Sequence, residues 1–306
     1  MSLVEIALKK MQSGAAAAKS AITPRSAPAG QEPRGPSAVV GKVVERSSHF
    51  PLAEGESANA SGKLVRIDPA ALRSAGLVPP EHQQRMLADQ YRHIKRPLVA
   101  AAIGRGVAKM PRGQIIMIAS AMPGEGKTWT SINLALSMSL EKDISVLLVD
   151  ADVAKPHISR TFGIDREPGV IDVLRDEKLN VESLILPTDV PNLSLLPAGQ
   201  HSETATELLA SHRMEATVNY LAESKPGRIV LIDSPPLLLT SESRALAHWA
   251  GQIVVVVCAD ITPQKAVIDA VSQLGNEKSV SLVLNQSKDA APGYYYGSGA
   301  LTSVQS

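Results

Sequence analysis

The sequence predicts an α/β domain whose mostly parallel β-sheet is covered by helices on both faces. From residue 114 onward, short apolar segments alternate with longer helix-like segments. The short segments are continuously apolar, as is typical of parallel strands buried on both sides, and the segments between them can form the crossover helices. Two of the apolar segments run directly into acidic residues, Asp150 and Asp233. Ligands of open parallel sheets bind at these carboxyl ends of strands.

The same pattern predicts the position of each element. Strands are expected at 115–120, 145–149, 193–196, 228–232, 252–258 and 279–284. Helices are expected at 127–140, 170–175, 205–221, 241–248 and 263–275. Upstream, Asp68 followed by Pro69 predicts the start of a short helix, and a charged helix over 81–95 is expected to end at Pro97.

We expect four parts along the chain. Residues 1–12 have the spacing of a short amphipathic helix, and 13–62 are rich in Ala, Ser, Pro and Gly, which predicts a disordered linker. Residues 63–288 form the folded domain, in which 63–100 are a helical extension. Residues 289–306 form a short flexible tail that contains three consecutive tyrosines.

The composition limits the partners and the cellular location. Hydrophobic residues make up 44% of the 306 residues but aromatic residues only 3%, so the core must be aliphatic. A net charge of +1 does not favour nucleic acid as a partner. The single cysteine, Cys258, cannot form an internal disulfide, and no apolar run approaches the ~20 residues of a membrane span. We therefore expect a cytoplasmic protein in which any membrane role comes through a partner.

The segment 121–128 (AMPGEGKT) has the features of a phosphate-binding loop. It lies between an expected strand and an expected helix, and its glycines allow backbone N–H groups to surround phosphate oxygens. Lys127 would reach the β- and γ-phosphates of ATP, and the hydroxyl of Thr128 would bind Mg²⁺. Ala121 replaces the first glycine of the usual motif, which is acceptable where φ is not positive. The expected nucleotide contacts are Pro123, Gly124, Glu125, Gly126, Lys127, Thr128 and Trp129, with Asn285 reading the adenine edge.

Acidic residues at two strand ends complete the predicted site. Asp150 and Asp152 follow one strand and Asp233 ends another, so all three can lie at the same sheet edge as Lys127. Mg²⁺ prefers oxygen ligands, which Thr128, Asp150 and Asp233 can supply. The expected catalytic residues are Lys127, Asp150 and Asp152. Either Asp150 or Asp152 could accept a proton from an attacking hydroxyl. The alternative is that the acids at the strand ends and Asn285 are turn residues without a chemical role.

These motifs resemble those of the bacterial tyrosine kinases, and more narrowly of the exosortase A-associated tyrosine autokinases of exopolysaccharide loci. The resemblance extends over 90–98, 120–128, 150–156, 232–236 and the C-terminal tyrosines. It implies a P-loop NTPase fold and ATP- and Mg²⁺-dependent autophosphorylation that regulates exopolysaccharide polymerisation and export. The implied phosphoacceptors are Tyr294, Tyr295 and Tyr296. Ala154 departs from the family pattern, which often has Arg at this position.

The resemblance also implies partners. An acid followed by two spaced basic residues marks the family's oligomerising helix, and Asp89, Arg92 and Lys95 have this spacing, with Asp in place of Glu and Lys in place of Arg. Spacing alone would make this helix a solvated face over a packed stripe. A ring-like homo-oligomer, a membrane polysaccharide co-polymerase (chain-length determinant protein) as activator, and a protein-tyrosine phosphatase are the implied partners.

Two other functions fit the same loop. One is a switch ATPase like the division-site and partitioning ATPases (MinD and ParA), which would control assembly at a membrane partner. These usually have a second lysine near the start of the loop, where this chain has Ala121, Met122 and Pro123. The other is a regulatory binding module with slow chemistry, which the complete set of loop and acidic residues disfavours.

Overall fold

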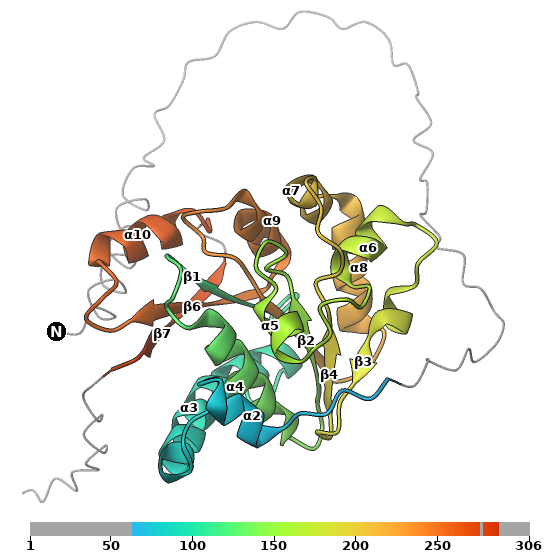
Figure 1. Cartoon of the computed structure of the whole chain (residues 1–306). Helices are drawn as coiled ribbons and strands as arrows, with labels where there is room; N and C mark the ends of the chain where they lie inside the picture. The colour runs from blue at the N-terminus through green and yellow to red at the C-terminus, as the bar shows by residue number, and fades with distance from the viewer. Residues whose placement is uncertain (1–62, 276–277, 288–306) are drawn as a thin grey trace, which may run out of the picture. The chain divides into compact units, whose positions relative to one another are not determined.

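A seven-stranded sheet forms the centre of the part of the chain that the computed structural model describes, residues 63–275 and 278–287 (Figure 1). The strand order is β3-β4-β2-β5-β1-β6-β7, and every pairing is parallel except that of β3 with β4. The strands are β1 (Ile115–Ser120), β2 (Ser145–Asp150), β3 (Leu186–Pro187), β4 (Leu193–Leu196), β5 (Arg228–Asp233), β6 (Gln252–Cys258) and β7 (Ser279–Asn285). The predicted α/β fold with a mostly parallel sheet is confirmed.

Helices cover both faces of this sheet. They are α2 (Pro69–Ser74), α3 (Gln84–Ile103), α4 (Lys127–Ser139), α5 (His157–Thr161), α6 (Val170–Arg175), α7 (Ala205–Leu209), α8 (His212–Glu223), α9 (Ser241–Trp249) and α10 (Gln264–Ser272), with short 3₁₀ turns at Glu81–Gln83 and Val181–Leu184. Figure 1 shows α3 and α4 on one side of the sheet and α9 and α10 on the other. Among the described residues, no helix combines the length and the apolar character that crossing a membrane requires.

Each strand contributes side chains to two cores because successive residues point to opposite faces. Met117 and Val255 belong to the core beneath α6 to α10, whereas Ile116, Ile118 and Val254 belong to the core beneath α2 to α5. Both cores are almost wholly aliphatic, as the composition predicts. Because β1 lies between β5 and β6, the loop that follows β1 is flanked by the carboxyl ends of both neighbours.

Three expectations lie outside the described residues: the amphipathic helix at 1–12, the linker at 13–62, and the tail at 289–306 with its tyrosines. The expected strands are confirmed to within one residue at either end. The helix expected at 205–221 is wrong as a single element. It is divided into α7 and α8, and Ser211 begins α8 by accepting a hydrogen bond from the backbone N–H of Met214.

The predicted end of the charged helix at Pro97 is also wrong. Helix α3 continues through Pro97 to Ile103 and ends at Gly104, whose φ of 77° is left-handed. Proline lacks an N–H and so removes one helical hydrogen bond. The helix continues because Leu98 and Val99, directly after the proline, are buried in the core, and this tertiary packing outweighs the local cost.

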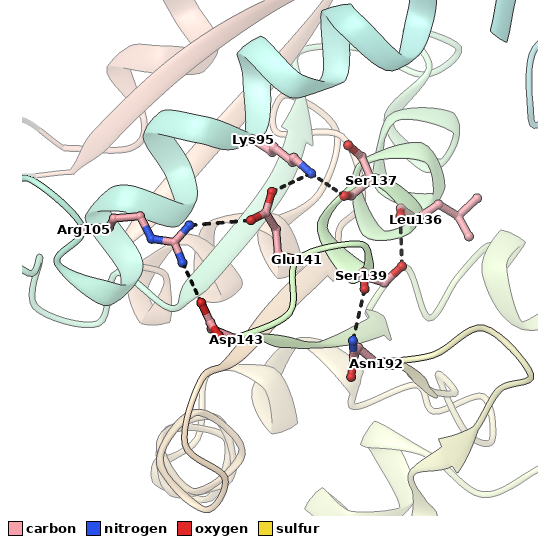
Figure 2. A network of polar contacts seen from close by, with 8 residues as sticks. All are labelled: Lys95, Arg105, Leu136, Ser137, Ser139, Glu141, Asp143 and Asn192. Atoms are coloured by element: carbon pink, nitrogen blue, oxygen red, sulfur yellow. Dashed lines mark hydrogen bonds and ion pairs between the residues drawn. The ribbon is translucent and has the colours of Figure 1, made fainter. Parts of the chain in front are cut away.

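Helix α3 packs along α4, the helix that begins at the predicted phosphate loop. The rings of Tyr91 and Trp129 lie 5.9 Å apart between centroids. Near the other end of α4, Lys95 Nζ donates to the carbonyl of Ser137 at 2.7 Å and lies 2.9 Å from Glu141 Oε1 (Figure 2). A cation at a helix C-terminus is favourable because it meets free carbonyl groups and the negative end of the helix dipole. Arg105 extends the network through Glu141.

The three residues expected to take part in oligomerisation lie in different surroundings. Asp89 and Arg92 are exposed and form an ion pair with each other, whereas Lys95 is only 6% exposed and is bound within its own chain. A step of three residues is short of the about 3.6 residues of a full helical turn, so each step in this series rotates the side chain around α3, and Lys95 faces α4. A role for Asp89, Arg92 and Lys95 in self-association stays a prediction, and of the three Lys95 is already bound within its own chain.

The first testable prediction compares Lys95→Met with Arg92→Met. We expect Lys95→Met to lower the free energy of unfolding by about 1–3 kcal/mol because it leaves the Ser137 carbonyl and Glu141 without their donor. The matched change Arg92→Met removes an exposed ion pair and should cost no more than about 1 kcal/mol. Urea unfolding measures both. Equal losses in the two variants would contradict the role given to Lys95.

Candidate functional site

The loop between β1 and α4 has the backbone that a phosphate-binding loop needs. Gly124 and Gly126 have φ values of 80° and 92°, in the left-handed region that glycine adopts without strain. Ala121 is fully buried and is not among the residues with positive φ, so alanine is acceptable at this departure from the usual motif. An added Cβ on Gly126 would lie 2.0 Å from Asn285 Nδ2, so the side chain of Asn285 packs tightly against the loop at this glycine.

The start of α4 offers free hydrogen-bond donors. The helix begins at Lys127, and the residue before it, Gly126, has no side chain that could cap the first turn. Within the described part of the chain, no hydrogen bond is present to the backbone N–H groups of Lys127 and Thr128. Free N–H groups and the positive end of the helix dipole together form an anion site. This end of α4 therefore suits the phosphates of a nucleotide.

Lys127 places a positive charge inside this site. Its side chain is only 8% exposed, and it forms no ion pair with any residue that the structure describes. Burial lowers the pKa of Lys127, while the nearby carboxylates of Asp233, Asp152 and Glu125 act in the opposite direction. A buried ammonium group at the free end of a helix is available to bind phosphate oxygens.

Polar side chains from the ends of β6 and β7 hold the loop in place. The buried carboxylate of Glu125 accepts the Met122 N–H at 2.7 Å and the hydroxyl of Thr262, so it points into the protein and away from a nucleotide. Asn285 Nδ2 donates to the Glu125 carbonyl at 2.9 Å, and Gln286 Nε2 donates to that of Gly124 at 3.4 Å. Thr262 and Gln286 carry no motif, so the sequence offered no signal for them.

Two of the predicted contacts thus have a second, structural role. Asn285 lies at the loop as expected, but its amide nitrogen is bound to backbone, and its contact with adenine stays a prediction. The ring of Trp129 packs against Tyr91 of α3, and its contact with a nucleotide stays a prediction. Pro123 is exposed in the loop.

Asp233 lies directly beside the start of α4. Thr128 Oγ1 donates to its Oδ2 at 2.9 Å, and Ser131 Oγ donates to its Oδ1 at 2.8 Å. Both carboxylate oxygens are therefore occupied. Burial raises the pKa of Asp233 to about 6, against the opposing effects of these hydroxyls and of Lys127. The pairing of β1 with β5 produces this contact, since Ile118 and Asp233 are opposite each other.

Asp150 and Asp152 are both buried at the end of β2, next to Asp233. Asp150 is opposite Asp233 in the β2–β5 pairing, and burial, followed by the charge of Asp233, raises the pKa of Asp150 to about 7. Burial also raises the pKa of Asp152, which accepts the Lys155 N–H at 3.1 Å and is close enough to Lys127 for that charge to oppose the shift. The structure thus brings all three predicted acids together with Lys127.

The residues present fit a magnesium ion held jointly with a nucleotide. Thr128, Asp150 and Asp233 offer only oxygen atoms, which Mg²⁺ prefers, and the crowded carboxylates favour a cation. Asp150 Oδ1 is buried with no hydrogen-bond partner among the described residues. In the same part of the chain, no group of three or more His, Cys, Asp or Glu side chains could hold a metal by itself. Phosphate oxygens and water would complete the ligand set, as is common for Mg²⁺.

Known proteins of similar sequence and structure include tyrosine-protein kinases. The family described as AAA domain matches residues 113–283. Tyrosine-protein kinase ptk of Acinetobacter johnsonii is 28% identical over 186 residues, which cover 60% of this chain and 25% of that relative. Tyrosine-protein kinase YwqD of Bacillus subtilis is 29% identical over 213 residues, or 68% of this chain and 86% of the relative. This chain thus spans about a quarter of the length of ptk but most of YwqD.

A solved structure shows the same fold. The kinase domain of VpsO is 27% identical and superimposes with a TM-score of 0.56 over 67% of this chain and 98% of that domain. The residues that match the AAA-domain family include the loop and the three acids.

The second testable prediction concerns the loop. Gly126→Ala should lower affinity for ATP by about tenfold or more, because its Cβ would displace Asn285 and because alanine is strained at this φ. Gly124→Ala is the matched control: it meets the same strain, but nothing lies within 4 Å of its added Cβ. Titration with a fluorescent ATP analogue measures both, and Gly126→Ala/Asn285→Ala should recover part of the loss. Equal affinities for the two single variants would contradict the close approach.

The third testable prediction concerns pH. Unfolded Asp titrates near 3.9, and in the folded protein the pKa values of Asp150 and Asp233 are raised to about 7 and about 6. The folded state therefore binds more protons between about pH 4 and 7, and its free energy of unfolding falls as pH rises through this range.

Asp150→Asn should remove part of this pH dependence in the nucleotide-free protein. We expect it to raise the free energy of unfolding at pH 8 by on the order of 2–4 kcal/mol and to change it little at pH 4. Urea unfolding across this range is the measurement, with the exposed Asp165→Asn as the matched control. An unchanged pH slope in Asp150→Asn would contradict the burial of a charged group at this position.

Proposed function

The chain belongs to the AAA-domain family and, within it, to the bacterial tyrosine kinases, and on this premise we propose that it transfers the γ-phosphoryl group of ATP to tyrosines of its own C-terminal segment. The observation that carries the proposal is the position of Lys127, buried at the free start of α4 and surrounded by carboxylates from β2 and β5. A loop that binds phosphates needs a lysine and a hydroxyl. The additional buried acids at β2 suit a reaction in which a hydroxyl loses a proton.

Different groups of the site would bind the phosphates and the metal ion. The N–H groups at the start of α4 and the ammonium group of Lys127 hold the phosphates. Thr128 and Asp233, with Asp150 nearby, would hold Mg²⁺, which neutralises charge on the transferred phosphoryl group when it is bound. Catalysis then comes mainly from alignment and from charge neutralisation, since phosphoryl transfer needs little covalent chemistry from the protein.

The acceptor proton goes to an acid of β2. Both oxygens of Asp233 already accept hydroxyl groups, from Thr128 and Ser131, so Asp233 is poorly placed to take a further proton. Asp150 retains an oxygen without a partner among the described residues, and Asp152 is bound through one oxygen to Lys155. One of these two acids accepts the proton of the tyrosine hydroxyl.

The chain is long enough for its tyrosines to reach such a site. Strand β7 ends at Asn285, whose side chain touches the phosphate loop. The seven residue-to-residue steps from Ser287 to Tyr294 can span at most about 25 Å. Tyr294, Tyr295 and Tyr296 are therefore the proposed phosphoacceptors, presented to the site of a neighbouring copy in a homo-oligomer.

The biological setting follows from the same family resemblance. Phosphorylation would regulate exopolysaccharide polymerisation and export. A membrane polysaccharide co-polymerase would activate the kinase and recruit it to the inner membrane, and a protein-tyrosine phosphatase would reverse the modification. The exposed pair Asp89 and Arg92 on α3 offers a surface for self-association.

The fourth testable prediction tests the reaction. Purified protein incubated with Mg²⁺ and ATP should gain phosphotyrosine at 294–296, detected by antibody and mapped by mass spectrometry. Lys127→Met should lower the rate at least about 100-fold because it removes the charge that faces the phosphates. Lys142→Met, an exposed lysine, is the matched control and should leave the rate unchanged.

Two further outcomes separate the alternatives. A variant with Phe at 294–296 should lose phosphotyrosine and keep ATP binding. ATP hydrolysis without phosphotyrosine, even after the membrane activator is added, would overturn the proposal in favour of a switch ATPase. Phosphotyrosine that persists in Lys127→Met would exclude this loop as the catalytic site.

A further inference from the structure

Exposed apolar side chains lie in and beside the phosphate loop, at the carboxyl edge of the sheet. Met122 in the loop is 42% exposed, Leu239 between β5 and α9 is 64% exposed, and Ile261 between β6 and α10 is 72% exposed. The strands that precede them, β5, β1 and β6, are adjacent in the sheet. Single exposed apolar residues are ordinary, but three around one ligand site mark a surface that another molecule covers. We call these three residues the apolar rim.

A backbone hydrogen bond holds Leu239 beside Met122. The N–H of Leu238 donates to the carbonyl of Ala121 at 3.3 Å. Each partner of this bond is followed directly by a residue of the rim. The segment after β5 and the phosphate loop are therefore in contact at this point, and both present a large apolar side chain to solvent.

A buried carboxylate holds Ile261 on the other side of the loop. One oxygen of Glu125 accepts the N–H of Met122 at 2.7 Å, and the other accepts the hydroxyl of Thr262, the residue after Ile261. The two oxygens of one carboxylate thus connect the phosphate loop to the β6–α10 segment. The rim is a continuous part of the surface in the sense that each of its members is bonded, through a neighbour, to the same loop.

Tyrosine has the chemistry that such a surface binds. Its ring is apolar and its hydroxyl is polar, so the side chain can lie with its ring on an apolar surface and its hydroxyl in a polar site. The rim and the proposed phosphate site meet in the loop, where Met122 and Lys127 are five positions apart. Serine and threonine have a hydroxyl but no ring, so an apolar rim favours tyrosine over both.

The chain leaves the sheet beside this rim. Strand β7 pairs with β6, and the N–H of Ala259, at the start of the segment that carries Ile261, donates to the carbonyl of Asn285 at 2.8 Å. Tyr294 follows Asn285 by nine positions, and three of the five tyrosines of the chain are at 294–296. The length of chain after β7 therefore allows the tyrosines to reach a rim at this edge of the sheet.

We propose that the apolar rim is the docking surface for the tyrosine segment 294–296 of a second copy of this chain, and that it selects tyrosine over serine and threonine. This inference rests on the kinase function proposed above and names the surface that presents its substrate. The rings of the segment cover Leu239 and Ile261, and the hydroxyl to be phosphorylated extends along the loop toward the phosphates.

The fifth testable prediction measures phosphorylation between two full-length copies. The enzyme copy carries Ser at 294–296 and the substrate copy carries Lys127→Met, so phosphotyrosine forms only from one copy to the other. Leu239→Ser/Ile261→Ser in the enzyme copy should raise the KM for the substrate copy by about tenfold to 100-fold, because a covered Leu or Ile contributes about tenfold or more. The KM for ATP should stay within about twofold, because an apolar side chain donates no hydrogen bond to phosphate.

Leu140→Ser is the matched control. Leu140 is 79% exposed and directly follows α4, at the end of that helix away from the loop. The change removes a similar apolar side chain from another part of the surface, so the KM for the substrate copy should equal that of the unchanged enzyme copy.

Binding without ATP tests the docking surface apart from catalysis. Fluorescence anisotropy of a labelled peptide with the sequence of 288–306 should show binding to the enzyme copy and at least about tenfold weaker binding to Leu239→Ser/Ile261→Ser. A peptide with Phe at 294–296 keeps the rings and should bind about as tightly, whereas one with Ser should bind at least about tenfold more weakly.

Each other outcome overturns a particular statement. Unchanged KM and peptide affinity in the double variant, or an equal loss in Leu140→Ser, would overturn the docking role. A raised KM for ATP with unchanged peptide affinity would assign the rim to the adenine base instead. Equal affinity of the Tyr and Ser peptides would overturn the selection of tyrosine. An absence of phosphotyrosine together with rim-dependent peptide binding would overturn the kinase function and leave the docking surface standing.

Discussion

Three carboxylates buried at one edge of an aliphatic sheet, with the ammonium group of Lys127 among them, set the main constraint on this structure. Charged groups are costly to bury unless they are paired or hydrogen-bonded. The protein offsets part of this cost with donors that are fixed by secondary structure. These are Thr128 and Ser131 on α4 for Asp233, and Ser159 on α5 for Asp150. The remaining cost raises the pKa values of the acids, so the site favours phosphates together with a cation.

Helix α4 joins this site to the rest of the domain. Its first turn supplies Lys127, Thr128 and free N–H groups, and its last turn is capped by Lys95 from α3. The helix is therefore held at both ends, by the acids at one and by a buried cation at the other. Asp89 and Arg92 lie on the outer side of the same α3, so a contact made there would act on a helix packed against the phosphate loop's own helix.

The phosphate loop itself is held by side-chain hydrogen bonds from neighbouring strand ends. Glu125 turns inward to Thr262, and Asn285 supports the loop at the carbonyl of Glu125. These contacts come from the ends of β6 and β7, on the opposite side of β1 from the acids. The loop thus lies between two sets of polar side chains. Those at the ends of β6 and β7 hold its backbone, and the acids at the ends of β2 and β5 lie beside Lys127.

The sequence by itself determined the α/β class, nearly every strand, the phosphate loop and the three acids, because strand hydrophobicity, glycine spacing and strand-end charge are local signals. Tertiary structure decided what depends on contacts between distant segments. Packing of Leu98 and Val99 carried α3 through Pro97, and the same packing turned Lys95 away from the exposed pair to which its spacing assigned it. The pairing of β2 with β4 brought Ala198 to Ser159, so only the folded chain could show which oxygen of Asp150 is held and which is left free.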